Sequence, residues 1–148
     1  MRPVLLDTNV VSELRKSKNR INPQVLSWAQ GLDIENSYLS VITLYELERG
    51  ILLLQKKDPR QSAGLADWLD AVTGNEFKGR ILPISASIAR RAAALQAEDP
   101  RPVPDAFIAA TARDHNMALA TRNIQDFLKT GIEALNPWEE GSPSVMLA

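Results

Sequence analysis

The sequence predicts an α/β fold, a three-layer α/β/α sandwich around a mainly parallel central sheet. Short apolar runs, which are typical of buried strands, alternate along the chain with longer segments whose apolar residues recur at helical spacing. Strands that alternate with helices form parallel sheets with helices on both faces. The chain has 148 residues, enough for one domain with its own core. We therefore expect a single domain over residues 1–140 and a flexible tail at 141–148.

In chain order, the elements expected in the first half are a strand at 4–6, helices at 10–16 and 23–30, a strand at 38–41, and helices at 43–57 and 60–72. Both strands are short and largely apolar, as in a buried parallel sheet. One helix begins with Pro23, which suits a first helical turn, and Gly31 lies just past its end. In another, apolar residues from Leu44 to Leu54 recur at three- and four-residue spacing, which predicts an amphipathic helix.

The elements expected in the second half are a strand at 80–84, a helix at 87–98, a loop at 99–104, a helix at 105–115, a strand at 117–121, a turn or short helix at 126–128 and a strand at 132–135. The loop contains Pro100, Pro102 and Pro104, and three prolines prevent regular backbone pairing there. The residues after 140 lack a clear period, which is why they are expected to form a tail.

Composition excludes several kinds of site. The chain has no cysteine, so disulfides, zinc–cysteine sites and thiol nucleophiles are excluded, and its one histidine, His115, excludes a histidine cluster. No apolar run approaches the roughly 20 residues of a membrane helix, and the start of the chain lacks a signal-peptide pattern, so we expect a cytoplasmic protein. The net charge of −1 argues against a strongly basic nucleic-acid binder but leaves room for an enzyme that holds nucleic acid briefly.

Four acidic residues stand where predicted strands end or predicted helices begin. They are Asp7, Glu46, Asp105 and Asp126. Ligands of open parallel sheets bind outside the carboxyl ends of the strands, so we expect these side chains to meet at one edge. Carboxylate oxygens, with no cysteine and a single histidine, select a hard cation such as Mg²⁺ or Mn²⁺. The pattern therefore indicates metal-dependent phosphoester or phosphodiester chemistry.

Each acid also has a purely structural interpretation. Asp7 and Asp126 can cap a turn or a helix, and Asp105 suits the first turn of a helix because of the helix dipole. Thr43 and Glu46 fit the spacing of a capping box. Taken together, these interpretations do not explain why four carboxylates should gather at one edge, where like charges repel unless a cation lies among them.

Four segments, in this order, carry a family resemblance. They are Leu6–Glu13 (LDTNVVSE), Ser40–Leu47 (SVITLYEL), Pro104–Ala112 (PDAFIAATA) and Ala120–Phe127 (ATRNIQDF). Together they resemble the PIN-domain proteins of the VapC toxin family, close to its FitB-like branch. The ending Asn136-Pro137-Trp138 is similar to that of the same branch. The resemblance spans residues 6–127 and implies a PIN-like fold.

The resemblance implies a Mg²⁺- or Mn²⁺-dependent endoribonuclease that acts as the toxin of a type II toxin–antitoxin pair. It implies hydrolysis of an RNA phosphodiester by a metal-activated water, leaving 5′-phosphate and 3′-hydroxyl ends. By position, Asp7 and Asp105 match direct metal ligands, and Glu46 matches a ligand or the base that orients the water. The resemblance also implies a homodimer and a cognate antitoxin that inhibits the site, with DNA contacted only through the antitoxin.

The fourth metal position is open between two residues. Family members often carry Asp directly after Thr-Arg, where this chain has Asn123, and Asp126 is the nearest acid. Either Asp126 is a ligand, or Asn123 holds a water of the ion while Asp126 lies further out. Thr8, Asn9 and Thr121 are expected to orient carboxylates or waters, although turn formation explains them equally well.

Arginines near the predicted acidic edge are candidates for contacts with RNA phosphate. Six arginines can form a rim: Arg80, Arg90, Arg91, Arg101, Arg113 and Arg122. Most are expected to be solvated surface, since charged residues on helices usually are. Arg122 and then Arg101 have the strongest claim, because they flank the predicted acids and Arg pairs well with phosphate.

Two other functions fit part of the pattern. A phosphatase of the haloacid-dehalogenase type also has a nucleophilic Asp after its first strand, but it needs a second Asp two residues later, where this chain has Asn9. A PIN fold without catalytic activity, acting as a binding module, is the other alternative. Asn123 favours that reading, whereas the presence of Asp7, Glu46 and Asp105 argues against it.

Overall fold

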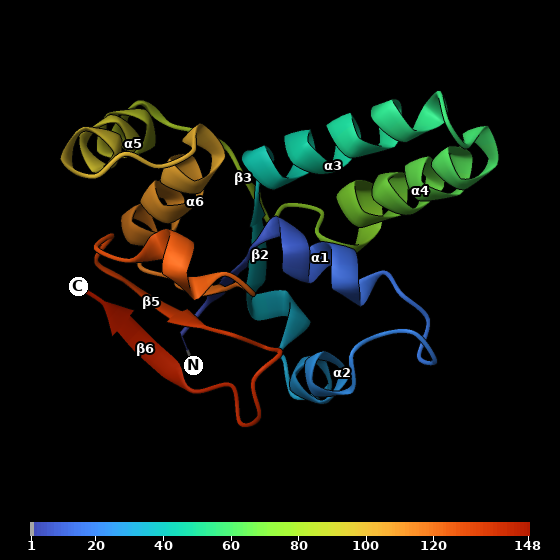
Figure 1. Ribbon diagram of the computed structural model, residues 1–148, viewed down its shortest axis with the longest axis horizontal. Helices are drawn as coiled ribbons and strands as arrows, with labels where there is room; N and C mark the ends of the chain where they lie inside the picture. Colours follow the sequence, from blue (N-terminus) through green and yellow to red (C-terminus); the bar gives the residue numbers. More distant parts are fainter. Residues whose placement is uncertain (1) are drawn as a thin grey trace.

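A six-stranded sheet in the order β3-β2-β1-β4-β5-β6 forms the centre of the computed structural model, which describes residues 2–148 (Figure 1). The strands are β1 (Val4–Leu6), β2 (Ser37–Ser40), β3 (Ile81–Leu82), β4 (Ala118–Ala120), β5 (Ile132–Leu135) and β6 (Ser144–Leu147). The pairs among the first five strands are parallel, whereas β5 and β6 pair antiparallel. The predicted α/β class with a mainly parallel sheet is therefore confirmed.

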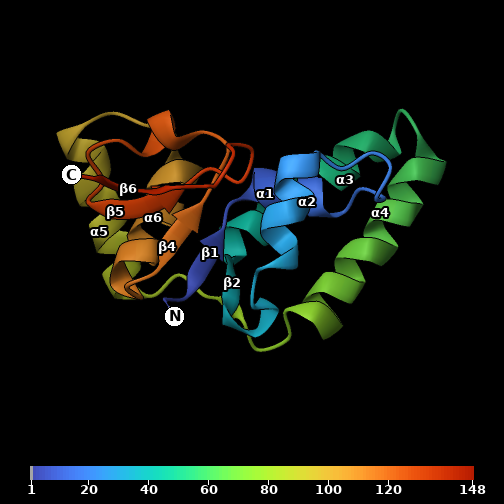
Figure 2. The same ribbon diagram turned by 90° about the horizontal axis from the view of Figure 1, so that it is seen from below.

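Six α-helices connect the strands: α1 (Thr8–Leu14), α2 (Pro23–Gln30), α3 (Val41–Gln55), α4 (Pro59–Ala71), α5 (Ala86–Glu98) and α6 (Val103–Asp114). Three shorter helical turns are η1 (Ile34–Asn36), η2 (Val72–Glu76) and η3 (Ile124–Phe127). The α5–α6 pair lies at one end of the molecule and the α3–α4 hairpin at the other (Figures 1 and 2). Within residues 2–148, no helix is both long and apolar enough to cross a membrane.

The core lies on both faces of the sheet, because successive side chains of a strand point to opposite faces. Leu5 packs into one cluster with α5 and α6, whereas the next residue, Leu6, packs into a second cluster with α1, α3 and α4. In β4, likewise, Leu119 packs into the first cluster and Ala120 into the second. Burial on both faces explains why these strands are continuous apolar runs instead of alternating ones.

Three helices, α1, α3 and α6, begin two residues earlier than predicted. α3 begins at Val41, because the hydroxyl of Ser40 accepts a hydrogen bond from the Ile42 N–H and caps the helix. The capping-box interpretation of Thr43 and Glu46 is therefore wrong, and Glu46 lies in the second turn. Similarly, α6 begins at 103, inside the predicted proline loop, since proline is tolerated in a first helical turn.

The prediction of a flexible tail at 141–148 is wrong, because this segment contains β6. This strand pairs antiparallel with β5, and Leu147 is buried in the core beside the α5–α6 helices. A turn at Gly141 and Ser142, both with positive φ, reverses the chain before β6. A short edge strand with one buried residue leaves little periodic signal in the sequence, which explains why it was missed.

Candidate active site

The four predicted acids come from elements that follow the carboxyl ends of parallel strands. Asp7 directly follows β1 and caps α1, and Asp126 lies in η3, shortly after β4. Glu46 lies in α3, the helix that follows β2, and Asp105 lies in the first turn of α6. The charges of Glu46 and Asp126 act on Asp7, and the charges of Asp7, Asp126 and Glu46 act on Asp105. The four elements therefore bring these side chains to the same edge of the sheet, with Asp7 and Asp105 as the two acids that the others affect.

Asp7 is the buried member of the group, with 7% of its surface exposed. Its carboxylate accepts hydrogen bonds from the Thr8 N–H at 2.8 Å and the Thr121 hydroxyl at 2.7 Å. Burial raises the pKa of Asp7, and the charges of Glu46 and Asp126 raise it further, although the two hydrogen bonds oppose these effects. The structural role as a cap is confirmed, but it leaves a buried carboxylate that repels its acidic neighbours.

Asp105 is partly buried, and its carboxylate makes no ion pair among residues 2–148. Burial raises the pKa of Asp105 to about 6, together with the charges of Asp7, Asp126 and Glu46, while Arg101 lowers it. Asp7 contributes the largest of the three electrostatic effects. A carboxylate with a raised pKa beside other carboxylates is a common feature of functional sites.

Glu46 is held by a hydroxyl group from a different helix. The Thr8 Oγ1 atom donates to Glu46 Oε1 at 2.7 Å and lies 3.1 Å from the Thr43 hydroxyl. Thr43 is fully buried one turn before Glu46, so α1 and α3 meet through these three side chains. The Thr8 hydroxyl therefore contacts a carboxylate, which is one of the two roles that the sequence left open for it. The sequence assigned Thr43 only to a capping box, although a threonine three residues before an acid lies on the same face of a helix, and this spacing is the signal that indicates such a contact.

Three further predicted support residues lie around Asp7. The Asn9 Nδ2 atom lies 3.4 Å from Asp7 Oδ2, and its Oδ1 accepts from the Arg122 N–H at 3.2 Å. Thr121 donates to Asp7, and its hydroxyl oxygen accepts from the Asn123 N–H at 3.1 Å. These bonds join the loop after β4 to the loop after β1, so they hold the two sides of the site in register.

The structure distinguishes the two candidates for the fourth metal position, Asp126 and Asn123. The charge of Asp126 raises the pKa of both Asp7 and Asp105, although its side chain is exposed. Asn123 contributes its backbone N–H, and its side chain makes no capping hydrogen bond to η3. Of the two candidates, Asp126 is therefore the one whose charge acts on Asp7 and Asp105.

The two predicted phosphate contacts differ in accessibility. Arg122 is exposed, and its guanidinium carbon lies 5.1 Å from the centre of the Trp138 ring, a cation–π contact. The side chain of Arg101 is only 6% exposed and is bound to Asp99 and to the Leu128 carbonyl. The expectation that Arg101 contacts phosphate is therefore not supported, because its guanidinium is used within the loop before α6.

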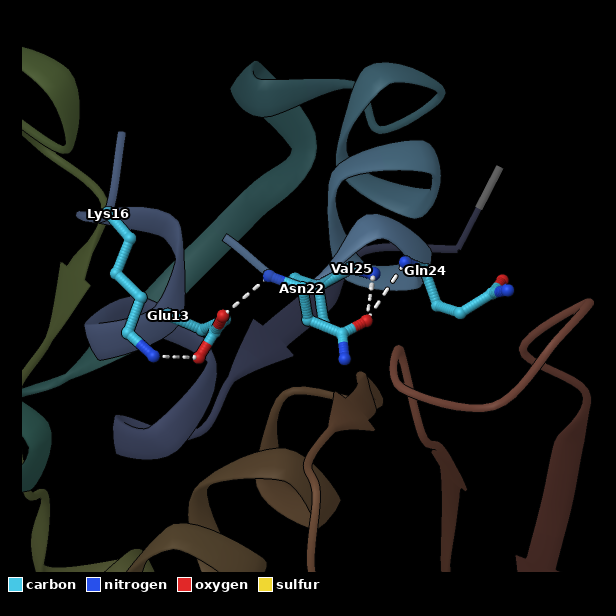
Figure 3. Close-up of polar contacts among 5 residues, drawn as sticks. All are labelled: Glu13, Lys16, Asn22, Gln24 and Val25. Carbon is cyan, nitrogen blue, oxygen red and sulfur yellow. Dashed lines mark hydrogen bonds and ion pairs between the residues drawn. The ribbon is translucent and has the colours of Figure 1, made fainter. Parts of the chain in front are cut away.

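Glu13 is a buried acid that the sequence reasoning did not assign. Its carboxylate accepts from Lys16 Nζ at 2.9 Å and from the Asn22 N–H at 2.8 Å (Figure 3). Burial raises the pKa of Glu13, but these hydrogen bonds and the charges of Lys16 and Arg122 outweigh it, so the pKa is lowered. Asn22 in turn caps α2 (Figure 3). The sequence signal for a buried Glu13 was its position three residues after Val10, which places both side chains on the same face of α1.

The acids fit a hydrated divalent cation better than a closed metal cage. No three Asp, Glu and His side chains in the described part of the chain, residues 2–148, converge on one metal position. Mg²⁺, however, keeps several waters and is usually bound through one or two carboxylates. Asp7 and Asp105 offer such a pair, with oxygen donors and mutual repulsion that a cation relieves.

Comparisons with known proteins agree with this geometry. A family model described as PIN domain matches residues 4–132. Toxin FitB of Neisseria gonorrhoeae is 34% identical over 143 residues, which cover 93% of this chain and 99% of that protein. VapC ribonuclease Y4jK of Sinorhizobium fredii is also 34% identical, over 92% of this chain and 98% of the relative.

A solved structure of FitAB bound to an IR36 DNA fragment contains a chain with the same fold. Its TM-score is 0.79 at 33% sequence identity, over 92% of this chain and 96% of that one. The matched region includes all four acids and the residues that hold them, since the family model begins before Asp7 and ends after Asp126. The chain therefore belongs to the PIN domain family, among its VapC-like and FitB-like members.

Proposed function

We propose that this chain is a Mg²⁺- or Mn²⁺-dependent endoribonuclease and the toxin of a type II toxin–antitoxin pair. The observation that carries the proposal is the arrangement of the acids at the sheet edge: Thr121 and Thr8 hold the carboxylates of Asp7 and Glu46. The charges of Asp7, Asp126 and Glu46, with burial, also raise the pKa of Asp105 to about 6. Acids that repel one another at a sheet edge are stable together when a cation joins them. The relatives named as a toxin and as a VapC ribonuclease support the same activity.

Asp7 and Asp105 would hold the metal ion, and Asp126 would complete the site from its outer side. A bound Mg²⁺ or Mn²⁺ would supply a Lewis acid that makes a water more acidic and offsets charge on a phosphoryl oxygen. Glu46, fixed by Thr8, is placed to accept a proton from the attacking water or to orient it. Thr121 and Asn9 keep the Asp7 carboxylate in one orientation.

Arg122 is the group that would bind the phosphate of the RNA strand. It is exposed beside a hollow of about 300 Å³ that Asn123 and Asp126 also line. Stacking on Trp138 limits the freedom of its guanidinium, so less conformational entropy is lost when phosphate binds. We also propose that the enzyme works in the cytoplasm, where an RNA substrate is available to it.

The partner that fits the rest of the surface is an antitoxin protein. Tyr45, Leu52 and Leu53 are 60%, 55% and 51% exposed along α3, where they line a groove of about 810 Å³ facing α4. An exposed apolar patch of this kind is typical of a protein-binding surface. Tyr45 and Glu46 are both on α3, so an antitoxin that binds this groove and extends around the helix would reach the acids and inhibit the site. We also propose a homodimer, to be measured by analytical ultracentrifugation.

The test of the activity is RNA cleavage by the purified chain with and without metal. EDTA should abolish cleavage, and added Mg²⁺ or Mn²⁺ should restore it. Asp105→Asn keeps the shape of the side chain but removes its charge, so it should reduce cleavage to background while the fold persists by circular dichroism. Asp67→Asn, an exposed change on α4, is the matched control. Cleavage that survives EDTA, or an Asp105→Asn variant as active as the control, contradicts the proposal.

A further inference from the structure

A second groove, of about 640 Å³, lies between α5 and α6. The two helices lie side by side at one end of the molecule (Figures 1 and 2). The charged residues that line the groove are Arg90, Arg91, Arg113 and Glu98, so cations outnumber anions three to one. In a chain with a net charge of −1, such a local excess of positive charge is a distinct surface feature.

The guanidinium groups of this groove are largely without partners. Among residues 2–148, neither Arg90 nor Arg113 makes an ion pair or a side-chain hydrogen bond. Arg91 Nε is buried without a hydrogen-bond acceptor, and its nearest anion, Asp114 Oδ1, lies 3.8 Å away. That same Asp114 oxygen already accepts from the Ser87 hydroxyl at 2.8 Å. Buried or clustered donors of this kind favour an anionic ligand.

Arg113 is packed closely against the chain after η3. Gly131 has a φ of +78°, and a Cβ atom built on it would lie 3.5 Å from the guanidinium carbon of Arg113. The guanidinium therefore lies directly against the backbone at Gly131, which limits the directions it can take. A side chain placed in advance loses less conformational entropy when it binds a ligand.

Adjacent residues of the chain line this groove and a second hollow beside the acidic site. Glu98 lines the groove, and the next residue, Asp99, lines a hollow of about 360 Å³ that Asp126 also lines. α6 itself connects the two regions, because Asp105 lies in its first turn and Arg113 in its last. Eight residues of α-helix span about 12 Å, so a strand that leaves the acids needs to advance only a short distance to reach Arg113.

We propose that the α5–α6 groove binds backbone phosphates of an RNA strand whose reacting bond lies at the acids. The inference rests on the proposed function, because it extends the same substrate along the surface. Arginine forks match phosphate oxygens, and Arg90, Arg91 and Arg113 have no carboxylate that occupies them fully. The groove supplies the positive surface that the overall charge of the chain lacks.

The experiment compares an Arg90→Gln/Arg113→Gln variant with a control that loses the same charge elsewhere. The control is Lys57→Gln/Arg60→Gln, two exposed residues in the turn after α3 and in the first turn of α4. Binding of a fluorescein-labelled single-stranded RNA is measured by anisotropy in EDTA, which prevents cleavage, over a range of salt concentrations. Thermal melts establish that both variants fold.

The groove variant should bind the RNA about tenfold more weakly than the control, and its slope of log K against log salt should be smaller by about 1.4, two phosphate contacts of about 0.7 each. Equal affinity and equal slope in the two variants overturn the proposal. Titration with inorganic phosphate separates a small-anion site: if the groove variant loses phosphate binding but keeps the RNA affinity of the control, the RNA assignment is overturned.

Cleavage is measured in parallel, with Mg²⁺ added, so that the two proposals can fail separately. If the unmodified chain cleaves RNA while the groove variant binds RNA as the control does, only the groove assignment is wrong. If the unmodified chain binds RNA through the groove but cleaves none under any metal condition, the proposed ribonuclease function is wrong and the binding site stands.

Discussion

The Thr121 hydroxyl donates a hydrogen bond of 2.7 Å to Oδ2 of Asp7, across 114 residues of sequence. This bond joins the ends of β4 and β1, which pair in parallel at the centre of the sheet. The backbone supports the same junction, because the Asp7 N–H donates to the Ala120 carbonyl at 2.9 Å. The orientation of the buried carboxylate therefore depends directly on how the two strands are paired.

Replacing Thr121 with valine should reduce RNA cleavage about 10- to 100-fold, as loss of a residue that orients a metal ligand does. The change keeps the volume of the side chain but leaves Asp7 Oδ2 without its closest donor. The measurement is kcat/KM at saturating Mg²⁺. Thr111→Val, which removes a buried hydroxyl bonded within α6, is the control and should retain activity. If the two variants have equal kcat/KM, Thr121 does not orient the Asp7 carboxylate for catalysis.

The stability of the metal-free chain should depend on pH through Asp105. Burial and the charges of Asp7, Asp126 and Glu46 raise its folded pKa to about 6, above the ordinary 3.8. The folded chain therefore binds the proton more tightly than the unfolded chain. The contribution of Asp105 to the free energy of unfolding is fully favourable below pH 3.8 and is lost as the pH rises through about 6.

Urea unfolding in EDTA at a series of pH values measures this effect. Asp105→Asn should be more stable than the unmodified chain above pH 6, and the two should converge in acid. Added Mg²⁺ should stabilise the unmodified chain at neutral pH but not the variant. A constant difference between the two chains at every pH contradicts the raised pKa.

Replacing Asp126 with asparagine tests the fourth position. Its charge raises the pKa of Asp7 and of Asp105, so its removal should shift the acid limb of the pH–rate profile to lower pH. Loss of a carboxylate at the edge of the site should also weaken Mg²⁺ binding, by about tenfold. Mn²⁺ titration calorimetry and the pH profile check the two effects. Asn123→Ala serves as the comparison, and a larger loss there assigns the position to Asn123.

Replacing the two arginines that were predicted to bind phosphate should have different effects: one on KM for RNA, the other on thermal stability. Arg122→Gln removes an exposed guanidinium and should raise KM for RNA while kcat and the melting temperature change little. Arg101→Gln removes a buried one that binds Asp99 and the Leu128 carbonyl, so it should lower the melting temperature instead. Steady-state kinetics and thermal melts of both variants measure this contrast. A rise in KM for Arg101→Gln without loss of stability contradicts the structural assignment of Arg101.

Glu13→Gln should destabilise the fold by about 1–3 kcal/mol, because one buried acceptor and the ion pair with Lys16 are lost. The pKa of Glu13 is lowered, so its contribution to stability is present above the ordinary value of 4.5 and is lost as the pH falls through the folded pKa. Urea unfolding at neutral and acidic pH measures both effects. The difference between the variant and the unmodified chain should shrink in acid, and a difference that grows there contradicts the assignment.

Secondary structure was predictable where local chemistry is strong. Pro23 and Gly31 mark the ends of α2, and the helix lies over Pro23–Gln30 as predicted. Local chemistry was misleading at the start of α3, where both Ser40 and Thr43 can cap the helix. Ser40 begins α3 instead of Thr43, because Ser40 ends a strand in extended conformation with its hydroxyl aimed at the Ile42 N–H. β6 was missed because its position depends on pairing with β5, and pairing partners are not encoded locally.

The sequence by itself determined the alternation of strands and helices and the oxygen-only chemistry, because composition, period and residue type are local properties. It also placed four acids after strand ends or near helix starts. Only the tertiary structure decided which groups those acids meet: Thr121 across the sheet for Asp7, and Thr8, which also contacts Thr43, for Glu46. It also brought the Arg101 guanidinium to Asp99. Burial and the distances between charges exist only once the chain is folded, and they set the pKa of Asp105 and the accessibility of each arginine.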